Sequence, residues 1–164
     1  MNGVDVRDLA GHPGESRAHR FDDPVEGLRV ELAEVRPARV NGNVRIDGVE
    51  GGVVVAGTLR APCAFTCARC LTPFEGTVDA WVNDLFTKVP GEDEYALDPE
   101  AMDLEPLVRD AVLLALPFSP VCREDCKGLC AECGKNRNDT DCGHPVESSD
   151  PRWAGLEQLL EQER

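Results

Sequence analysis

The residues with the clearest chemical potential are cysteines, and most of them lie near the C-terminal end of the chain. The 164-residue sequence holds 8 cysteines and 3 histidines. Zinc binds four nitrogen or sulfur ligands in a tetrahedron, and ligand pairs a few positions apart can converge on one ion. The stretch from 122 to 144 therefore predicts a zinc-binding module. Its six candidate ligands are Cys122, Cys126, Cys130, Cys133, Cys142 and His144.

The spacing within this stretch suggests which side chains bind the metal. Cys130-Ala131-Glu132-Cys133-Gly134 has the form of a zinc knuckle, in which the glycine lets backbone N–H groups turn toward sulfur. The predicted ligands are Cys126, Cys130, Cys133 and Cys142, with Cys122 and His144 as alternatives for the fourth position. A closed, cysteine-rich shell predicts a structural ion. Buried or disulfide-bonded cysteines are the weaker alternative, given so many ligand types so close together.

A second group of cysteines, Cys63, Cys67 and Cys70, allows several interpretations. Cys67 and Cys70 could form a redox pair, half of a metal site, or a turn between strands. A thioredoxin-like redox pair requires a βαβ context, whereas the surrounding pattern is antiparallel. Only three sulfurs are present and no histidine is nearby. A thiol oxidoreductase using this pair therefore remains a second alternative function.

Alternating apolar residues predict a β-rich middle to the chain. Residues 28–32 alternate with period two, and strands are expected over 53–59 and 74–82. Asn41-Gly42 favours a hairpin turn, because both central residues of a type I′ turn need positive φ. Gly51-Gly52 predicts a second turn. Residues 1–24 have turn composition and are expected to form a loosely ordered lead-in.

One helix is predicted after an acidic loop. Asp103 is the expected cap, Pro106 is tolerated in the first turn, and Pro117 ends the helix. A short final helix is expected from Asp150. The predicted fold class is α+β: a curved antiparallel sheet or partial barrel, a covering helix and a C-terminal zinc-knuckle module. The expected domains are 1–24, 25–117 and 118–164.

Charge and the absence of several motifs limit the possible functions. The net charge is −14, and residues 77–119 carry 10 acids against 2 bases. Direct phosphate binding needs a basic footprint, so this middle region is not expected to lie on RNA. No phosphate-binding glycine loop or nucleophile elbow is present. Without a basic and apolar leader or a long apolar run, the chain is expected to be cytoplasmic and not membrane-bound.

Several motifs occur in an order that resembles a known family. CARCLTPF at 67–74 is followed by DLEPLVRDAVLLALP at 103–117, CREDCKGLCAECG at 122–134, and finally CGH and DPRWAGLEQL. This order is similar to that of the bacterial YceD family, the large ribosomal RNA subunit accumulation proteins. The resemblance spans nearly the whole chain. It implies a non-catalytic ribosome biogenesis factor that supports synthesis, processing or stability of large-subunit (23S) ribosomal RNA.

The resemblance makes ribosomal RNA or its precursor the expected partner, with a basic large-subunit ribosomal protein as a further possibility. An acidic protein-interaction module that binds such a protein without touching RNA is the main alternative, because opposite charges favour association. Direct RNA contact would use local clusters of basic side chains. The candidates are Arg36, Arg39, Arg45, Arg60, Arg69, Lys127, Lys135 and Arg137.

Overall fold

The protein consists of two compact units that meet in the sequence between Cys126 and Lys127. The computed structural model describes residues 3–92, 94–98 and 101–144. The boundary falls nine residues after the expected one at 117/118, so Cys122 and Cys126 belong to the first unit. The expected helix from Asp150 lies outside the described residues. Within the described part, no helix is long and apolar enough to cross a bilayer.

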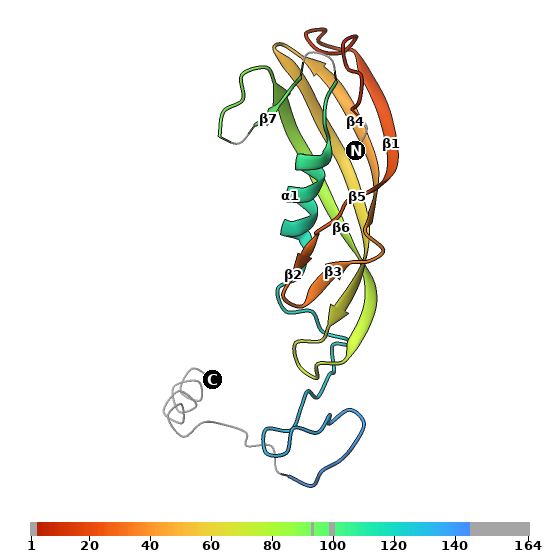
Figure 1. The fold of residues 1–164 in the computed structure, drawn as a ribbon, viewed down its shortest axis with the longest axis vertical. Helices are drawn as coiled ribbons and strands as arrows, with labels where there is room; N and C mark the ends of the chain where they lie inside the picture. Colours follow the sequence, from red (N-terminus) through yellow and green to blue (C-terminus); the bar gives the residue numbers. More distant parts are fainter. Residues whose placement is uncertain (1–2, 93, 99–100, 145–164) are drawn as a thin grey trace, which may run out of the picture. The chain divides into compact units, whose positions relative to one another are not determined.

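The first unit is built on an open, seven-stranded sheet (Figure 1). Its strand order is β1-β4-β5-β3-β2, with β6 pairing β5 and β7 pairing β6. Among the strand pairs of the described residues, only β6–β7 is parallel. The antiparallel sheet and the covering helix are confirmed, but the sheet does not close. The strands are β1 (Ser16–Pro24), β2 (Arg29–Val30), β3 (Ala33–Val35), β4 (Arg39–Val49), β5 (Gly52–Thr66), β6 (Pro73–Thr87) and β7 (Tyr95–Ala96).

Alternation along the long strands separates a buried face from an exposed one. In β4, Val40, Val44 and Ile46 are buried, while Asn41, Asn43 and Arg45, on the opposite face, are exposed. The buried face packs against helix α1 (Glu105–Ala115), which contacts mainly β6 (Figure 1). Because a strand places successive side chains on opposite faces, the other face of the sheet is left to solvent.

Helix α1 begins and ends close to the predicted positions. The Asp103 carboxylate accepts a hydrogen bond of 2.9 Å from the backbone N–H of Glu105. Pro106 lies in the first turn, where its missing N–H has no helical partner to lose. Leu107, Val108 and Val112 form the buried stripe that covers the sheet. The amphipathic pattern therefore predicted both the extent and the orientation of the helix.

The expected hairpin at Asn41-Gly42 is wrong, because both residues lie inside β4. Gly42 pairs with Phe21 of β1, and a Cβ at Gly42 would lie 2.1 Å from two atoms of the Phe21 ring. The glycine is needed for this close approach of a neighbouring ring, and no turn is formed. The real turn between β4 and β5 lies at Glu50-Gly51, where Gly51 has φ of 87°.

The first 24 residues also differ from the expected loose lead-in. Val6 and Leu9 are 3% exposed and belong to the hydrophobic core, and Val4 forms a bridge with Met102. Strand β1 pairs with β4 along its whole length. Its inward positions are only half-buried, so its sequence carries little apolar alternation. Residues 28–32 likewise do not form one strand, because β2 and β3 turn back on each other there.

The single tyrosine allows a pH test of the packing of α1 against the sheet. The Tyr95 hydroxyl donates a 3.0 Å hydrogen bond to Asp110 of α1. Burial, this hydrogen bond and the charges of Asp110 and Asp84 raise the pKa of Tyr95 from 10.0 to about 12. The pKa of Tyr95 is therefore higher in the folded protein than in the unfolded chain. The contribution of the neutral hydroxyl to the free energy of unfolding is complete below pH 10 and is lost as the pH rises through about 12.

We therefore expect the ultraviolet absorbance of tyrosinate to appear with a midpoint near pH 12 in the folded protein. The Asp110→Asn variant should titrate at a lower pH, because the negative charge that opposes ionisation is gone. A midpoint near the ordinary value of 10.0 in the folded wild-type protein would show that the contact between Tyr95 and Asp110 is absent in solution.

Candidate metal centres

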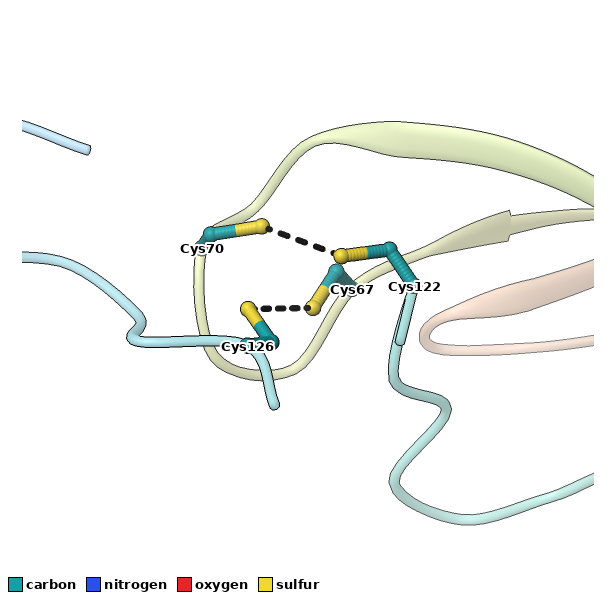
Figure 2. A group of neighbouring side chains, drawn as sticks. All are labelled: Cys67, Cys70, Cys122 and Cys126. Atoms are coloured by element: carbon teal, nitrogen blue, oxygen red, sulfur yellow. Dashed lines mark hydrogen bonds between the residues drawn. The ribbon is translucent and has the colours of Figure 1, made fainter. Parts of the chain in front are cut away.

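Four cysteines from two distant segments meet in the first unit (Figure 2). Their sulfur atoms all lie within 4.8 Å of one another. The Cys67–Cys126 sulfurs are 3.8 Å apart and the Cys70–Cys122 sulfurs 3.7 Å apart. A zinc ion with Zn–S distances near 2.3 Å has tetrahedral S···S edges of about 3.8 Å. We call Cys67, Cys70, Cys122 and Cys126 the four-cysteine centre, and its geometry fits such an ion.

The connection between β5 and β6 positions the first half of the four-cysteine centre. Cys67 directly follows β5, and its backbone N–H donates to the Thr72 carbonyl at 3.0 Å. The turn closes when the Leu71 N–H donates to the Cys67 carbonyl at 2.9 Å. Leu71 has φ of 58°, a left-handed conformation that is uncommon for a side chain of this kind. The tight turn directs both thiols of the pair to one side.

Hydrogen bonds hold the second half, residues 120–126, against this turn. The backbone N–H of Ala68 donates to the Pro120 carbonyl at 2.8 Å. The Arg69 guanidinium donates to the carbonyls of Glu124 and Cys126, both at 3.2 Å. The centre packs as a small cluster apart from the main core and seals the end of the β5–β6 hairpin. In this cluster Cys67, Cys70 and Cys126 are buried, and Phe74 and Cys122 are half-buried.

A second group lies wholly within the second unit and contains Cys130, Cys133, Cys142 and His144, which we call the cysteine–histidine centre. Its ligand atoms also lie within 4.8 Å of one another. The Cys130 sulfur is 3.5 Å from Nδ1 of His144. Zn–S of about 2.3 Å and Zn–N of about 2.0 Å predict a tetrahedral S···N edge of about 3.5 Å. This donor set too fits a zinc ion.

The Cys130–Cys133 loop has the geometry of a knuckle. The Gly134 N–H donates to the Cys130 carbonyl and the Cys130 N–H to the Lys135 carbonyl, each at 2.8 Å. Gly134 has φ of 69°, so a glycine suits this position. A bridge between Leu129 and Asn136 closes the base of the loop. Gly134 therefore closes a turn directly after the second thiol of the pair.

The electrostatics favour one thiolate in each centre, Cys67 in the first and Cys130 in the second. Burial alone would raise the pKa of Cys67, but N–H groups of Cys122, Cys70 and Arg69 directed at its sulfur lower it to about 6. N–H groups of Cys133 and Glu132 likewise lower the pKa of Cys130 to about 6. Burial and hydrogen bonds to neighbouring thiols instead raise the pKa of Cys122 to about 12. A divalent cation would replace the protons that such neighbouring sulfurs share.

The grouping of ligands differs from the one expected from the sequence. Cys126 was expected with Cys130, Cys133 and Cys142, but it lies with Cys67, Cys70 and Cys122, and His144 takes the fourth place beside the other three. The six C-terminal candidates therefore divide between two centres. The physical reason is the antiparallel return of β6, which brings the Cys67–Cys70 turn to the segment that follows α1.

A signal in the sequence could have led to this arrangement. The ligands occur as four close pairs, and each pair supplies half of a tetrahedral site: Cys67-x2-Cys70, Cys122-x3-Cys126, Cys130-x2-Cys133 and Cys142-x1-His144. Four pairs make two sites. Cys63 is buried in the main core beside the Ala61 carbonyl and belongs to neither centre. The joint burial of Cys67 and Cys70 with two further thiols favours metal binding over an accessible redox pair.

The predicted RNA-contacting side chains are scattered over both units. Arg39, Arg45 and Arg60 lie on the exposed face of the sheet, but each pairs with an aspartate at 3.0, 2.8 and 2.6 Å, respectively. Arg36 pairs with Glu34 at 2.8 Å, and Arg69 is engaged at the four-cysteine centre. Lys127, Lys135 and Arg137 belong to the second unit. Contact of these eight side chains with RNA stays a prediction. Arg36, Arg39, Arg45 and Arg60 would attract phosphate less strongly than free arginines, because a carboxylate partly neutralises each of them.

Comparison with known proteins places this chain in one family. The sequence model described as "Large ribosomal RNA subunit accumulation protein YceD" matches residues 55–160. An uncharacterised protein of Mycobacterium tuberculosis is 38% identical over 96% of this chain and 80% of its own length. The uncharacterised Bacillus subtilis protein YlbN is 26% identical over 93% of this chain and 94% of its own.

A plant relative has a more informative name. The Arabidopsis thaliana "Large ribosomal RNA subunit accumulation protein YCED homolog 1, chloroplastic" is 31% identical over 51% of this chain and 25% of its own length. No solved structure gave a significant match.

Proposed function

Because this chain belongs to the YceD family, we propose that it supports the synthesis, processing or stability of large-subunit (23S) ribosomal RNA as a binding protein in the cytoplasm. The observation that carries the proposal is the family match over residues 55–160, which include all eight residues of the two centres. The names of the plant relatives add the link to large-subunit RNA.

We further propose that both centres hold structural zinc. Thiolate and imidazole donors in tetrahedral groups suit zinc, and four protein ligands leave no position for a reacting water. Zinc with a complete shell stabilises the fold and takes no part in a chemical step. The proposed role is therefore non-catalytic: the metal ions hold the β5–β6 turn and the second unit in shape, and surfaces of the protein bind a partner.

A second candidate function is supported by an acidic hollow between β7 and α1. Carboxylates of Asp84, Glu92, Glu94 and Asp110 line it together with apolar Leu113 and Leu114. A basic segment of a ribosomal protein would match both its charge and its apolar floor. In this version the protein acts on large-subunit assembly through a protein partner and without touching RNA.

Depletion in growing cells tests the proposed function. We expect the ratio of large-subunit to small-subunit ribosomal RNA to fall, measured on total RNA, and to recover when the wild-type chain is supplied. The Cys63→Ala variant, which leaves both centres intact, should also restore it. An unchanged ratio in cells that lack the protein would refute the proposed function, whichever partner it binds.

A further inference from the structure

The sheet face turned away from α1 carries a pattern that neither metal centre explains. The strand register aligns its exposed residues in rows that cross β1, β4, β5 and β6. Because neighbouring strands lie about 4.8 Å apart, each row spans about 14 Å. We call the eight residues of two adjacent rows the Trp81 platform. One row contains Arg20, Asn43, Thr58 and Trp81, and the other contains Asp22, Asn41, Arg60 and Asp79.

Trp81 is the most unusual member of the platform. Its side chain is 81% exposed, although its neighbours in β6, Ala80 and Val82, are buried. A tryptophan at a fully solvated strand position contributes little to the core, and its indole face is open to a ligand. Trp81 is one of the residues that line a hollow of about 480 Å³. Asn41, Asn43, Thr58, Arg60 and Asp79 help to line this hollow.

The platform and its borders are less acidic than the rest of the chain. Four arginines and three aspartates lie in this region, on a chain whose net charge is −14. The arginines are Arg20, Arg39, Arg45 and Arg60. Arg60 makes two hydrogen bonds to Asp79, at 2.6 and 3.1 Å. Arg20 reaches only the Asn43 side-chain oxygen, at 3.4 Å, and has no carboxylate partner among the described residues. Arg20 is thus a cation available to a ligand.

We propose that the Trp81 platform binds single-stranded RNA, with one base stacked on Trp81 and the backbone phosphates held by Arg20 and Arg60. That the ligand is RNA rests on the proposed function. That it is single-stranded and stacks on Trp81 rests on the residues of the platform. Aromatic side chains on a four-stranded sheet stack unpaired bases, and amides such as Asn41 and Asn43 can bond their edges. A duplex hides these base faces, so a single strand is the better fit.

Fluorescence tests the proposal directly, because the chain has only two tryptophans. In the Trp153→Phe variant Trp81 is the sole indole, and a mixed-sequence single-stranded RNA of about 12 nucleotides, within the usual site size, is the probe. We expect saturable quenching, and about tenfold or greater loss of affinity in Trp81→Ala, measured by anisotropy of labelled RNA. Trp81→Phe should lose less. Phe118→Ala, which removes a 96% exposed aromatic side chain outside the platform, is the matched control and should bind normally.

A change in the charge of the platform provides a second test, in which the RNA affinity is expected to rise. Asp79→Asn removes the carboxylate that competes with phosphate for Arg60, so RNA affinity should rise, whereas Arg60→Ala should lower the affinity and flatten the slope of log K against log[salt] by about 0.7. A basic peptide such as heptalysine should bind Asp79→Asn less well than the wild type if the platform instead serves a protein. Absent quenching by RNA, equal affinity of Trp81→Ala, or Trp81 quenching by heptalysine alone would each overturn the proposal.

The cellular experiment separates this inference from the proposed function. If depletion lowers large-subunit RNA but Trp81→Ala binds the probe as well as the wild type does, the function stands and the platform assignment is wrong. If depletion has no effect while Trp81→Ala abolishes probe binding, the platform stands and the proposed function is wrong.

Discussion

Cys67→Ser is expected to reduce the zinc content from two ions per chain to one and to lower the melting temperature by more than about 10 °C. Cys67 is fully buried, and its sulfur lies 3.8 Å from that of Cys126, 59 positions away. A cross-link between segments this far apart lowers the conformational entropy of the unfolded chain. This loss of entropy stabilises the folded state by about 4 kcal/mol. For a unit of this size, losing about 4 kcal/mol of the free energy of unfolding lowers the melting temperature by more than about 10 °C.

A buried cysteine that belongs to neither centre provides the control. Cys63 is 2% exposed and lies in the main core. Cys63→Ala should retain two zinc ions, and its stability should fall by only about 1 kcal/mol, because a small group is removed from a packed site. Metal analysis and calorimetry on both variants decide the matter. Two zinc ions retained in Cys67→Ser, or equal losses in the two variants, would contradict a metal at the four-cysteine centre.

Cys133→Ser is expected to unfold the described part of the second unit while the sheet stays intact. Residues 127–144 contain no helix or named strand, and Cys130 is the only side chain of this stretch that is buried. Without an apolar core, the free energy of folding must come from the metal, and structural zinc contributes on the order of 10 kcal/mol in such modules. Hydrogen exchange should then show full loss of protection over 127–144.

The neighbouring Glu132 supplies the matched variant for this experiment. Glu132 is exposed, lies between the two knuckle ligands in the sequence and is not itself a candidate ligand, so Glu132→Gln should keep two zinc ions and normal exchange. Protection across β4, β5 and β6 should be the same in both variants. Retained protection over 127–144 in zinc-free Cys133→Ser would show that the second unit folds without its metal. Loss of protection in the sheet would show that the two units unfold together.

The sequence predicted most reliably where a local pattern decides the structure. Helix α1 follows from its apolar spacing and from Asp103. The β-branched residues of 53–59 and the alternation of 74–82 predicted parts of β5 and β6, but both strands are longer than expected. The knuckle at Cys130 follows from the spacing of two thiols and a glycine. In each case the decisive contacts are made by residues a few positions apart, so the pattern and the physical cause lie in the same short segment.

Predictions failed where a distant residue decides. Asn41-Gly42 has the composition of a hairpin turn, but the Phe21 ring requires the glycine inside a strand. Local spacing identifies Cys67-x2-Cys70 as half of a site but does not say which other pair completes it, because the partner lies beyond two strands and a helix. The alternation of residues 74–82 predicts a strand, but it does not show which residues of other strands lie beside Trp81. The row that joins Trp81 to Arg20 depends on the register of four strands.

The two centres are completed at different times during synthesis. The ligands that face each other in the four-cysteine centre are 52 and 59 positions apart, whereas Cys130 and His144 are separated by only 14. At about 5–20 residues per second, the Cys67–Cys70 pair waits roughly 3 to 12 s for its partners, and the cysteine–histidine centre needs roughly 1 to 3 s. During that interval the nascent chain exposes a free dithiol. Oxidants or competing soft metals would therefore damage new molecules at the β5–β6 turn far more readily than finished ones.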